Sequence, residues 1–334
     1  MFIVDSYTTA VLFCIVTMLC WGSWANTQKL VEGRWPFALF YWDYVIGILL
    51  FSLLAAFTLG SMGEKGRGFL VDIAQADIGN MGLALLGGVI FNLANMLLTA
   101  SIALAGMSVA FPIGIGIALV LGVLVNYLTM AKGDATQLSI GVLLVMLAIV
   151  INAVAYHRKA RSQSQGSRKG ILLAVVAGLL MSFFYRFLAA GMDLNDFENP
   201  AAGKMTPYTA FFIFAVGILL SNLLFNTYLM RNPISGEKVD YSDYAKGRAS
   251  LHLVGILGGC IWGLGNIFNL IAAEKAGPAV SYGLGQGATL VAALWGVLIW
   301  KEFKGADASV TRLIYLMFAC FVVGLGLIVR AGMS

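Results

Sequence analysis

Long apolar stretches follow one another along the whole chain, and short polar segments separate them. A helix needs about 20 apolar residues to cross the hydrocarbon core of a bilayer. Windows of that length predict an all-α membrane protein with ten transmembrane helices and no separate soluble domain. The predicted spans are 8–29, 36–60, 78–104, 107–130, 137–156, 170–190, 207–230, 251–274, 278–300 and 310–330.

Composition supports a lipid environment. The chain has 334 residues, of which 60% are hydrophobic and 11% are charged, whereas about a quarter of the residues of a soluble domain are charged. The residues before the first span include no Lys or Arg, and within the span the apolar run is followed by WGSWANTQK in place of a small-residue cleavage site. We therefore predict a retained helix there and not a signal peptide.

The positive charges are divided unevenly between the two sets of loops. The loops that follow the odd-numbered spans, counted with the span ends beside them, carry 14 of the 21 Lys and Arg residues, and the opposite side carries six. Because cytoplasmic loops are richer in Lys and Arg, we expect both termini outside and the basic linker 157–169 in the cytoplasm, with the protein in a plasma (inner) membrane. Membrane topology then explains the excess of basic residues, and no nucleic-acid partner is expected.

The two halves of the chain resemble each other. The 34 residues from Gly87 align without gaps with those from Gly258, and 12 positions are identical at an offset of 171. Similarity of composition alone would give scattered Leu and Val matches, yet the pairs are of another kind. They include Asn95/Asn266, Gly106/Gly277, Gly114/Gly285 and Gly116/Gly287, the aromatic pairs Phe91/Trp262 and Phe111/Tyr282, and GILL at Gly47 and Gly217.

Five spans in each half determine the geometry of this repeat. After five crossings the chain is on the other side of the membrane, so the second half must be inserted upside down. We predict a first five-helix repeat over 1–156, the linker 157–169, and a second, inverted five-helix repeat over 170–334. Inverted repeats are typical of secondary transporters, in which the substrate site lies near the midplane at the repeat interface.

Ten spans in two halves, Gly-rich fourth and ninth helices and the turn WKEFKGA at 300–306 resemble the drug/metabolite transporter superfamily. Within it, LCWGSWANTQK in the first helix, YWDY in the second, outside termini and a basic central linker most resemble the ureide permease and bacterial sugar-uptake (glucose-ribose porter) branch. This resemblance implies a transporter of monosaccharides, or of ureides and nucleobases. The linker sequence RSQSQGSRKG lacks the GxxxxGK[ST] pattern of a phosphate loop, so no role for ATP is inferred.

Asp43 is the one acid in the apolar run FYWDYVIGILLF. A charge at the bilayer centre costs at least ~2.5–3.5 kcal/mol, and such residues usually mark transport pathways. At an offset of 170 Asp43 aligns with Ile213, so packing of the repeat alone does not require an acid. A low dielectric favours the protonated form of a carboxyl group, so we expect Asp43 to exchange a proton and couple it to transport. Sodium coupling stays open as an alternative.

The helical rise of ~1.5 Å per residue predicts the depth of the other polar residues in the membrane. Trp21, Asp43, Asn92 and Asn95 fall at a similar inner depth, and Arg186 and Asn266 fall nearer the outside. Amides combined with tryptophan suit a neutral, polar small molecule. The candidate substrate-binding residues are Trp21, Trp24, Asn92, Asn95, Arg186, Trp262, Asn266, Tyr282 and Gln286.

These candidates have structural alternatives. Asn and Gln in membrane helices often only join neighbouring helices by hydrogen bonds. Trp near the end of a span can be an interfacial anchor, and Arg186 can extend outward to the headgroups. Asp43 and Arg186 are the hardest to explain by packing, although their predicted depths differ by ~14 Å, which is too far for a direct ion pair.

Catalytic and metal-binding patterns are missing from the sequence. The two histidines, His157 and His252, lie at predicted cytoplasmic ends of spans, and neither HExxH nor GxSxG occurs. The four cysteines fall inside spans without CxxC spacing. We therefore expect no enzyme, no cofactor and no metal site.

The leading functional hypothesis is a secondary active transporter of a small polar neutral solute that works by proton symport and alternating access. An exporter of amino acids or drug-like metabolites on the same fold is the alternative, and a receptor that moves no solute is a third reading. The expected partners are the solute, a proton or sodium ion, and the lipid bilayer. The sequence leaves a homodimer open.

Overall fold

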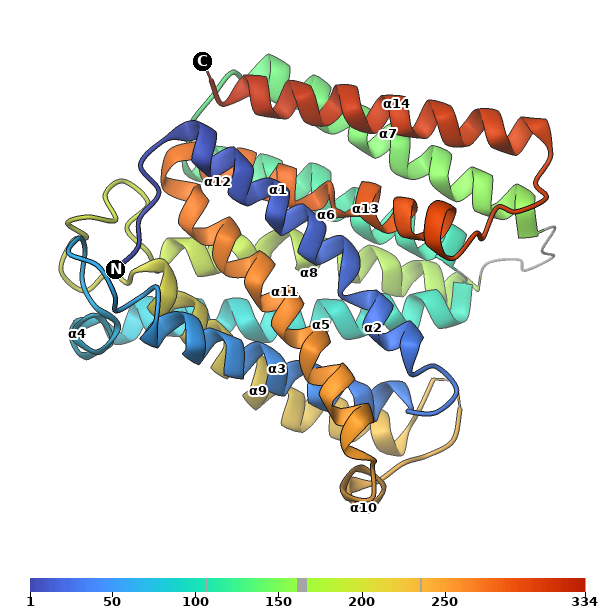
Figure 1. Cartoon of the computed structure of the whole chain (residues 1–334), viewed down its shortest axis with the longest axis horizontal. Helices are drawn as coiled ribbons and strands as arrows, with labels where there is room; N and C mark the ends of the chain where they lie inside the picture. Colours follow the sequence, from blue (N-terminus) through green and yellow to red (C-terminus); the bar gives the residue numbers. More distant parts are fainter. Residues whose placement is uncertain (106, 161–166, 235, 334) are drawn as a thin grey trace. The chain divides into compact units, whose positions relative to one another are not determined.

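A computed structural model describes residues 1–105, 107–160, 167–234 and 236–333 (Figure 1). The described chain is α-helical and contains no strand, so the predicted all-α class is confirmed. Among these residues, ten helical segments are long and apolar enough to cross a membrane, as the sequence predicts. They are Tyr7–Leu30, Phe37–Phe57, Ile78–Ala105, Pro112–Thr129, Ala135–Lys159, Arg168–Ala190, Pro207–Arg231, Ala249–Ala276, Pro278–Ile299 and Ala308–Ala331. The chain is a multi-pass membrane protein.

Two of the ten segments are interrupted, and two short helices lie in loops that the hydropathy pattern leaves unassigned. The first segment changes helix at Trp24, and the ninth changes at Gly287 and ends in a π-helical turn. The elements are α1 (Tyr7–Ser23), α2 (Ala25–Leu30), α3 (Phe37–Phe57), α4 (Phe69–Gln75), α5 (Ile78–Ala105), α6 (Met107–Thr129), α7 (Ala135–Ala160), α8 (Arg168–Ala190), α9 (Pro207–Arg231), α10 (Tyr241–Ala245), α11 (Ala249–Ala276), α12 (Pro278–Gln286), α13 (Ala288–Leu294), the π-helix Trp295–Ile299, and α14 (Ala308–Ala331).

The described chain forms two compact units, and each draws on both sequence halves. Unit 1 comprises Met1–Leu93 and Phe184–Lys275, and unit 2 comprises Ala94–Phe183 and Ala276–Ser334. The predicted repeats, 1–156 and 170–334, are defined by sequence similarity and not by these compact units, so they stay a prediction. Part of the predicted linker 157–169, residues 161–166, lies outside the described residues.

Glycines bring helices of unit 1 into close contact. A Cβ atom at Gly47 or Gly259 would meet the backbone of the facing helix in the α3–α11 pair, and one at Gly88 or Gly217 would do so in the α5–α9 pair. Small residues allow such backbone approach between membrane helices. The predicted repeat pairs Gly47 with Gly217 and Gly88 with Gly259, so the two approaches are the counterparts that an inverted repeat would generate.

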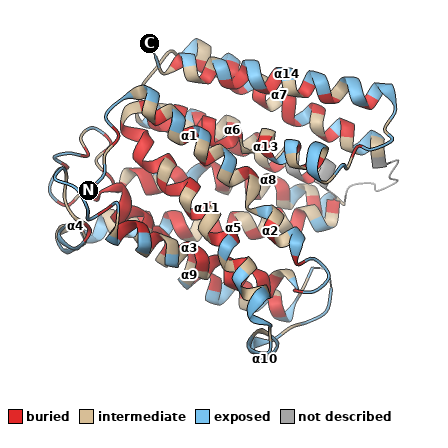
Figure 2. Ribbon diagram, in the orientation of Figure 1, coloured by how far each residue is buried: buried red, intermediate tan, exposed pale blue. Residues whose placement is uncertain are grey.

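Unit 2 packs in the same manner. α7 and α14 lie side by side (Figure 1), and a Cβ atom at Gly141 would lie 2.7 Å from the carbonyl oxygen of Gly324. The opposite face of α14 is exposed (Figure 2) and carries large apolar side chains, among them Tyr315, Val322 and Val323. An apolar exposed face on a helix of this length is expected where the helix contacts lipid.

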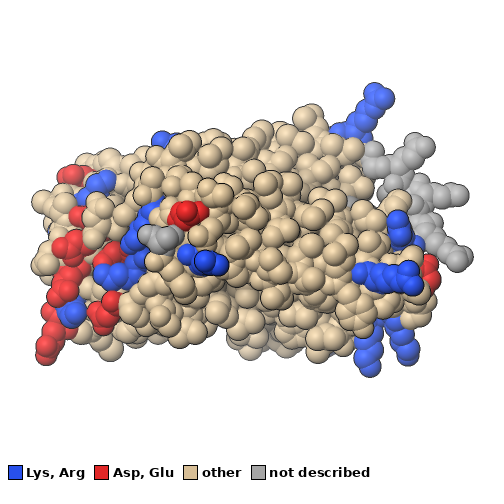
Figure 3. Space-filling view, turned by 90° about the horizontal axis from the view of Figure 1, so that it is seen from above, with Lys and Arg blue, Asp and Glu red and all other residues tan. Residues whose placement is uncertain are grey.

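Charged side chains are scarce over the middle of one face of the described chain (Figure 3). On the face shown in Figure 3, Lys, Arg, Asp and Glu gather toward the two ends, and the broad region between them carries hardly any. The burial cost of a charge in hydrocarbon explains this distribution.

Candidate functional site

Asp43 is a fully buried acid in the second turn of α3, with 0% of its surface exposed. Pro36 ends the preceding loop and caps α3, which places Trp35 beside the first turns of the helix. The indole Nε1–H of Trp35 donates to Asp43 Oδ2 at 2.9 Å, and the Tyr244 hydroxyl donates to Oδ1 at 2.6 Å. His252 Nδ1 lies 2.7 Å from the same Oδ1. We call Asp43, Trp35, Tyr244 and His252 the carboxylate cluster.

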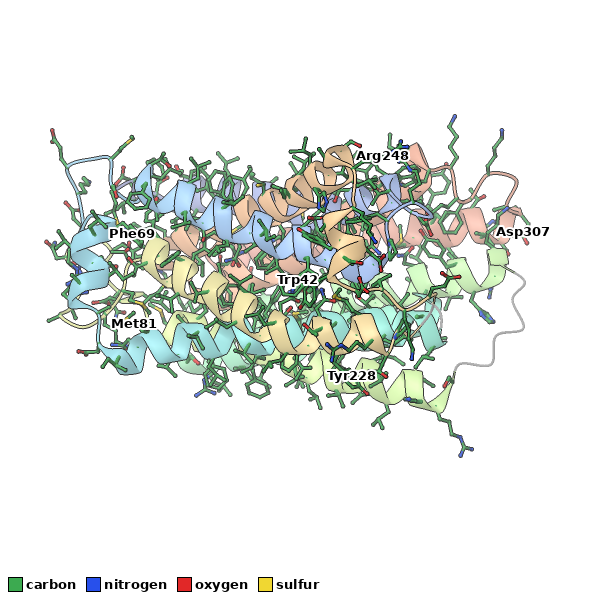
Figure 4. The ribbon with its side chains drawn as sticks, turned by 90° about the horizontal axis from the view of Figure 1, so that it is seen from below. Trp42, Phe69, Met81, Tyr228, Arg248 and Asp307 are labelled. Atoms are coloured by element: carbon green, nitrogen blue, oxygen red, sulfur yellow. The ribbon has the colours of Figure 1, made fainter. Side chains whose placement is uncertain are left out.

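Three elements of unit 1 supply the partners of Asp43. Trp35 precedes α3, Tyr244 lies on α10, and His252 lies in the first turn of α11. Figure 4 marks Trp42, the neighbour of Asp43 on α3, and Arg248, which precedes α11, while Phe69 on α4 marks the other end of the unit.

The rings of the carboxylate cluster pack around the imidazole. The His252 ring meets those of Trp35 and Tyr244 edge-on, with centroids 5.1 and 4.7 Å away. Burial, and then the hydrogen bond to Asp43, raises the pKa of the Tyr244 hydroxyl above its usual range, so this group stays a donor. Gly255 faces the Asp43 side chain, where any Cβ atom would collide with it. Asp43 thus has the paired and hydrogen-bonded surroundings that a buried charge requires.

Sequence reasoning identified Asp43 but missed its three partners. His252 was assigned only to the end of a span. The two spans, 36–60 and 251–274, begin on the same predicted side of the membrane, which was the available signal. The predicted span ends still place Asp43 about 9 Å deeper than His252 at ~1.5 Å per residue, so the depth estimate did not pair them.

A row of aromatic rings runs through unit 1. Trp262 on α11 stacks on Trp21 of α1 with centroids 5.9 Å apart and an interplanar angle of 10°. It also packs against Phe91 of α5 at 4.5 Å and Phe214 of α9 at 6.2 Å. Phe91 and Trp262 are partners in the predicted repeat, and residues that contact their own counterparts lie on the axis that relates two repeats. We call these four residues the aromatic row.

Buried polar atoms without hydrogen-bond partners lie beside the aromatic row. Within the described residues, neither amide atom of Asn266 has a partner, nor has the indole nitrogen of Trp21. Asn266 follows Trp262 by one helical turn on α11, and a Cβ atom at Gly265 would lie 3.0 Å from Trp21 Nε1. A buried polar group left unpaired costs about 1–3 kcal/mol. Among the residues that the structure describes, these groups keep unused hydrogen-bonding capacity.

A second aromatic group joins Trp24 to Asn92. Trp24 packs on Tyr44 with centroids 4.6 Å apart, and Tyr44 packs on Tyr41 at 5.4 Å. The Tyr41 hydroxyl donates to Asn92 Oδ1 at 3.0 Å, and Asn92 Nδ2 donates to Ser221 Oγ at 2.9 Å. Asn92 therefore joins α5 to α3 and α9, which is the structural alternative considered for it.

The structure separates residues that the depth estimate grouped together. Asp43, Trp21 and Asn92 belong to three distinct sets of contacts within unit 1. Asn95 is half-buried on α5, and Arg186 is exposed on α8, outside both the carboxylate cluster and the aromatic row.

The remaining candidates lie in unit 2. The Tyr282 hydroxyl on α12 is 3.2 Å from the carbonyl oxygens of both Ala118 and Met181, and Gly122 leaves room for its ring. Gln286, the last residue of α12, is buried. No group of three His, Cys, Asp or Glu residues that could hold a metal ion occurs in the part of the chain that the structure describes.

Comparison with known proteins places the chain among transporters. Residues 12–329 match the family model described as "Sugar transport protein". Ureide permease 2 of Arabidopsis thaliana is 25% identical, with 96% of each chain covered. A protein of Streptococcus pyogenes serotype M1 named "Putative sugar uptake protein" is 23% identical over 94% of this chain and 96% of its own. A solved crystal structure matches with a TM-score of 0.65 and 16% identity over 96% of this chain and 97% of its own, which shows the fold.

Proposed function

Because the chain belongs to the sugar transport protein family, we propose that it is a secondary active transporter that moves a small, neutral, polar solute by proton symport and alternating access. Family membership supports the coarse assignment, a transporter of small solutes. The solute class proposed here is a monosaccharide, or a ureide or nucleobase, since the relatives include ureide permeases and a protein named for sugar uptake. Asp43 is the proposed coupling carboxylate.

One observation carries the solute site. The aromatic row presents flat apolar faces directly beside the unpaired polar atoms of Trp21 and Asn266. Ligand sites combine such apolar walls with a few polar groups that fix orientation. The donors and acceptors are uncharged, which suits a neutral solute, and the contact between Phe91 and Trp262 fits a site where two inverted repeats meet.

The coupling role of Asp43 is supported by its burial and by its partners. A carboxylate at 0% exposure on a membrane helix is costly unless it is paired, and His252 is the titratable cation-forming group beside it. Since Ile213 stands at the corresponding position of the second half, the acid is not a requirement of the repeated packing.

The proposed topology has both termini outside a plasma (inner) membrane and the linker 157–169 in the cytoplasm. The bias of Lys and Arg toward one set of loops supports it. This orientation also assigns the carboxylate cluster to the cytoplasmic end of unit 1.

Purified protein in liposomes tests the proposal. We expect an inward-directed proton gradient to drive accumulation of a labelled solute among glucose, ribose, uracil and allantoin, and a protonophore to abolish it. Accumulation that depends on a sodium gradient alone would show that sodium, and not the proton, is the coupling ion. Net efflux of amino acids or cationic drugs, with no uptake of the four solutes, would favour the exporter, and absence of any solute movement would contradict transport.

A further inference from the structure

His252 differs from Asp43 in its exposure at the surface of unit 1. The side chain of Asp43 is 0% exposed, whereas that of His252 is 22% exposed, and the two share a contact of 2.7 Å. His252 therefore gives a proton from outside a route to Asp43, whose own side chain is not exposed in this conformation. We propose that His252 is the residue that takes up the coupling proton and shares it with Asp43. This proposal rests on the proposed proton symport and deepens it.

The hydrogen bonds define how a single proton changes the pair. An ionised Asp43 accepts from Trp35, from Tyr244 and from the Nδ1–H of a neutral His252. The remaining ring nitrogen, Nε2, faces the backbone at Gly247 between α10 and α11. One proton bound at Nε2 produces an imidazolium, so the net charge of the pair changes from −1 to zero, and release of that proton restores the negative pair.

The same contacts hold a loop against α3. Tyr244 binds Asp43, and Tyr241 packs on Trp42 with centroids 5.9 Å apart, so α10 meets two consecutive residues of α3. A reciprocal cap between Asp240 and Asp243 keeps α10 helical. Any movement that separates α10 and α11 from α3 must break the contacts of Asp43. The protonation state of His252 thereby affects the closure of this end of unit 1.

The titratable neighbours of the pair are few. In the portion of the chain that the structure describes, Tyr244 on α10 and His252 on α11 are the titratable groups in contact with Asp43. Trp35, from the segment before α3, contributes only a neutral donor. Histidine is a side chain that proteins use as a proton shuttle.

Transport by variants in liposomes gives the first test. We expect His252→Gln to lower proton-driven accumulation of solute about tenfold or more, which corresponds to at least about 1.4 kcal/mol. The dependence of accumulation on pH between about pH 5 and 8 should become flatter. Exchange of labelled for unlabelled solute, which needs no net proton movement, should stay within about twofold. His157→Gln is the matched control, since this other histidine is exposed at the end of α7 in unit 2 and should behave as the wild type.

Nitrogen-15 NMR of histidine gives a second test that needs no transport. Because the chain has two histidines, a His157→Gln variant shows histidine signals from His252 only. We expect Asp43→Asn to change the Nδ1 resonance of His252 and Tyr244→Phe to change it less. Unchanged signals in Asp43→Asn would overturn the pair.

The outcomes separate the two proposals. Wild-type protein that moves solute without a proton would contradict the proposed symport. Wild-type protein that is proton-driven, together with a His252→Gln variant that keeps its accumulation and pH profile, would overturn the inference alone. Loss of both accumulation and exchange in His252→Gln, with a lowered melting temperature, would assign His252 a structural role and also overturn it.

Discussion

The carboxylate cluster and the aromatic row lie in the same unit, but they differ in whether their buried polar atoms have hydrogen-bond partners. Around Asp43, one carboxylate oxygen accepts from Trp35 and the other from Tyr244, and His252 Nδ1 lies 2.7 Å from the second oxygen. Beside Trp262, the amide of Asn266 and the indole nitrogen of Trp21 are buried without partners among the described residues. Among the described residues, the polar atoms of the first region are hydrogen-bonded, and those of the second are left without partners.

This difference separates stability from binding. Satisfied networks hold elements together, and removal of one member leaves the others unpaired. Unsatisfied groups weaken the fold and become favourable only when a ligand pairs with them. We therefore expect changes in the carboxylate cluster to alter the stability of the protein without solute, and changes in the aromatic row to alter mainly the affinity for solute.

The largest expected effect is on stability, in Asp43→Leu. Removing the carboxylate leaves Trp35, Tyr244 and His252 without their shared partner, and each buried group left unpaired costs about 1–3 kcal/mol. Thermal unfolding in detergent without solute should shift downward accordingly, and Asp43→Asn, which keeps hydrogen-bonding atoms, should shift less. Equal melting temperatures for wild type and Asp43→Leu would show that the cluster does not hold α10 and α11 to α3.

Trp262→Ala should have the next largest effect, and on affinity. Loss of the indole removes the ring against which Trp21, Phe91 and Phe214 pack. We expect the dissociation constant for solute to rise by at least about tenfold, or about 1.4 kcal/mol. Binding is measured by calorimetry or by ligand-induced thermal shift. Trp262→Phe keeps an aromatic face and controls for the cavity; if both variants bind like the wild type, the aromatic row is not the solute site.

Asn266→Leu distinguishes the two regions most directly. Replacing an unpaired buried amide by an apolar group of similar size should leave the unfolding free energy unchanged or raise it by about 1 kcal/mol. The solute affinity should fall about tenfold, since a lost hydrogen bond is worth about 0.5–1.5 kcal/mol and the vacated partner on the solute is buried. Asn222→Leu is the matched control, because the Asn222 amide on α9 is also buried without a partner. A loss of stability in Asn266→Leu would mean that its amide is satisfied in the native protein.

Hydropathy predicted most of the fold, because the bilayer restricts spanning segments to long apolar helices. All ten predicted spans appear within a few residues of their ends. The short helix α10 was missed because five residues have too few positions for a periodic signal, although its capping pair Asp240 and Asp243 was visible.

The site was predicted less completely than the fold. Asp43 and Trp262 stand out by residue type, but the depth estimate gives a position along the membrane normal and no direction around the helix. It therefore placed Trp21, Asp43 and Asn92 together, although they point into separate groups of contacts. Which helix faces meet is decided by tertiary packing, such as the Gly47–Gly259 approach, and this information is not contained in one helix alone.

The smallest effect compares two buried tyrosines that differ in their partners. Tyr282→Phe removes a hydroxyl that lies within 3.2 Å of two carbonyl oxygens and should cost about 1 kcal/mol of unfolding free energy. Tyr44→Phe removes a hydroxyl that has no partner among the described residues, so stability should stay the same or rise slightly. The two substitutions are chemically identical and both side chains are fully buried, so the difference in melting temperature isolates hydrogen-bond satisfaction from packing. Equal losses in both variants would indicate that the hydroxyl of Tyr44 is paired in the membrane, and the contrast between satisfied and unsatisfied regions would then be weaker than the geometry indicates.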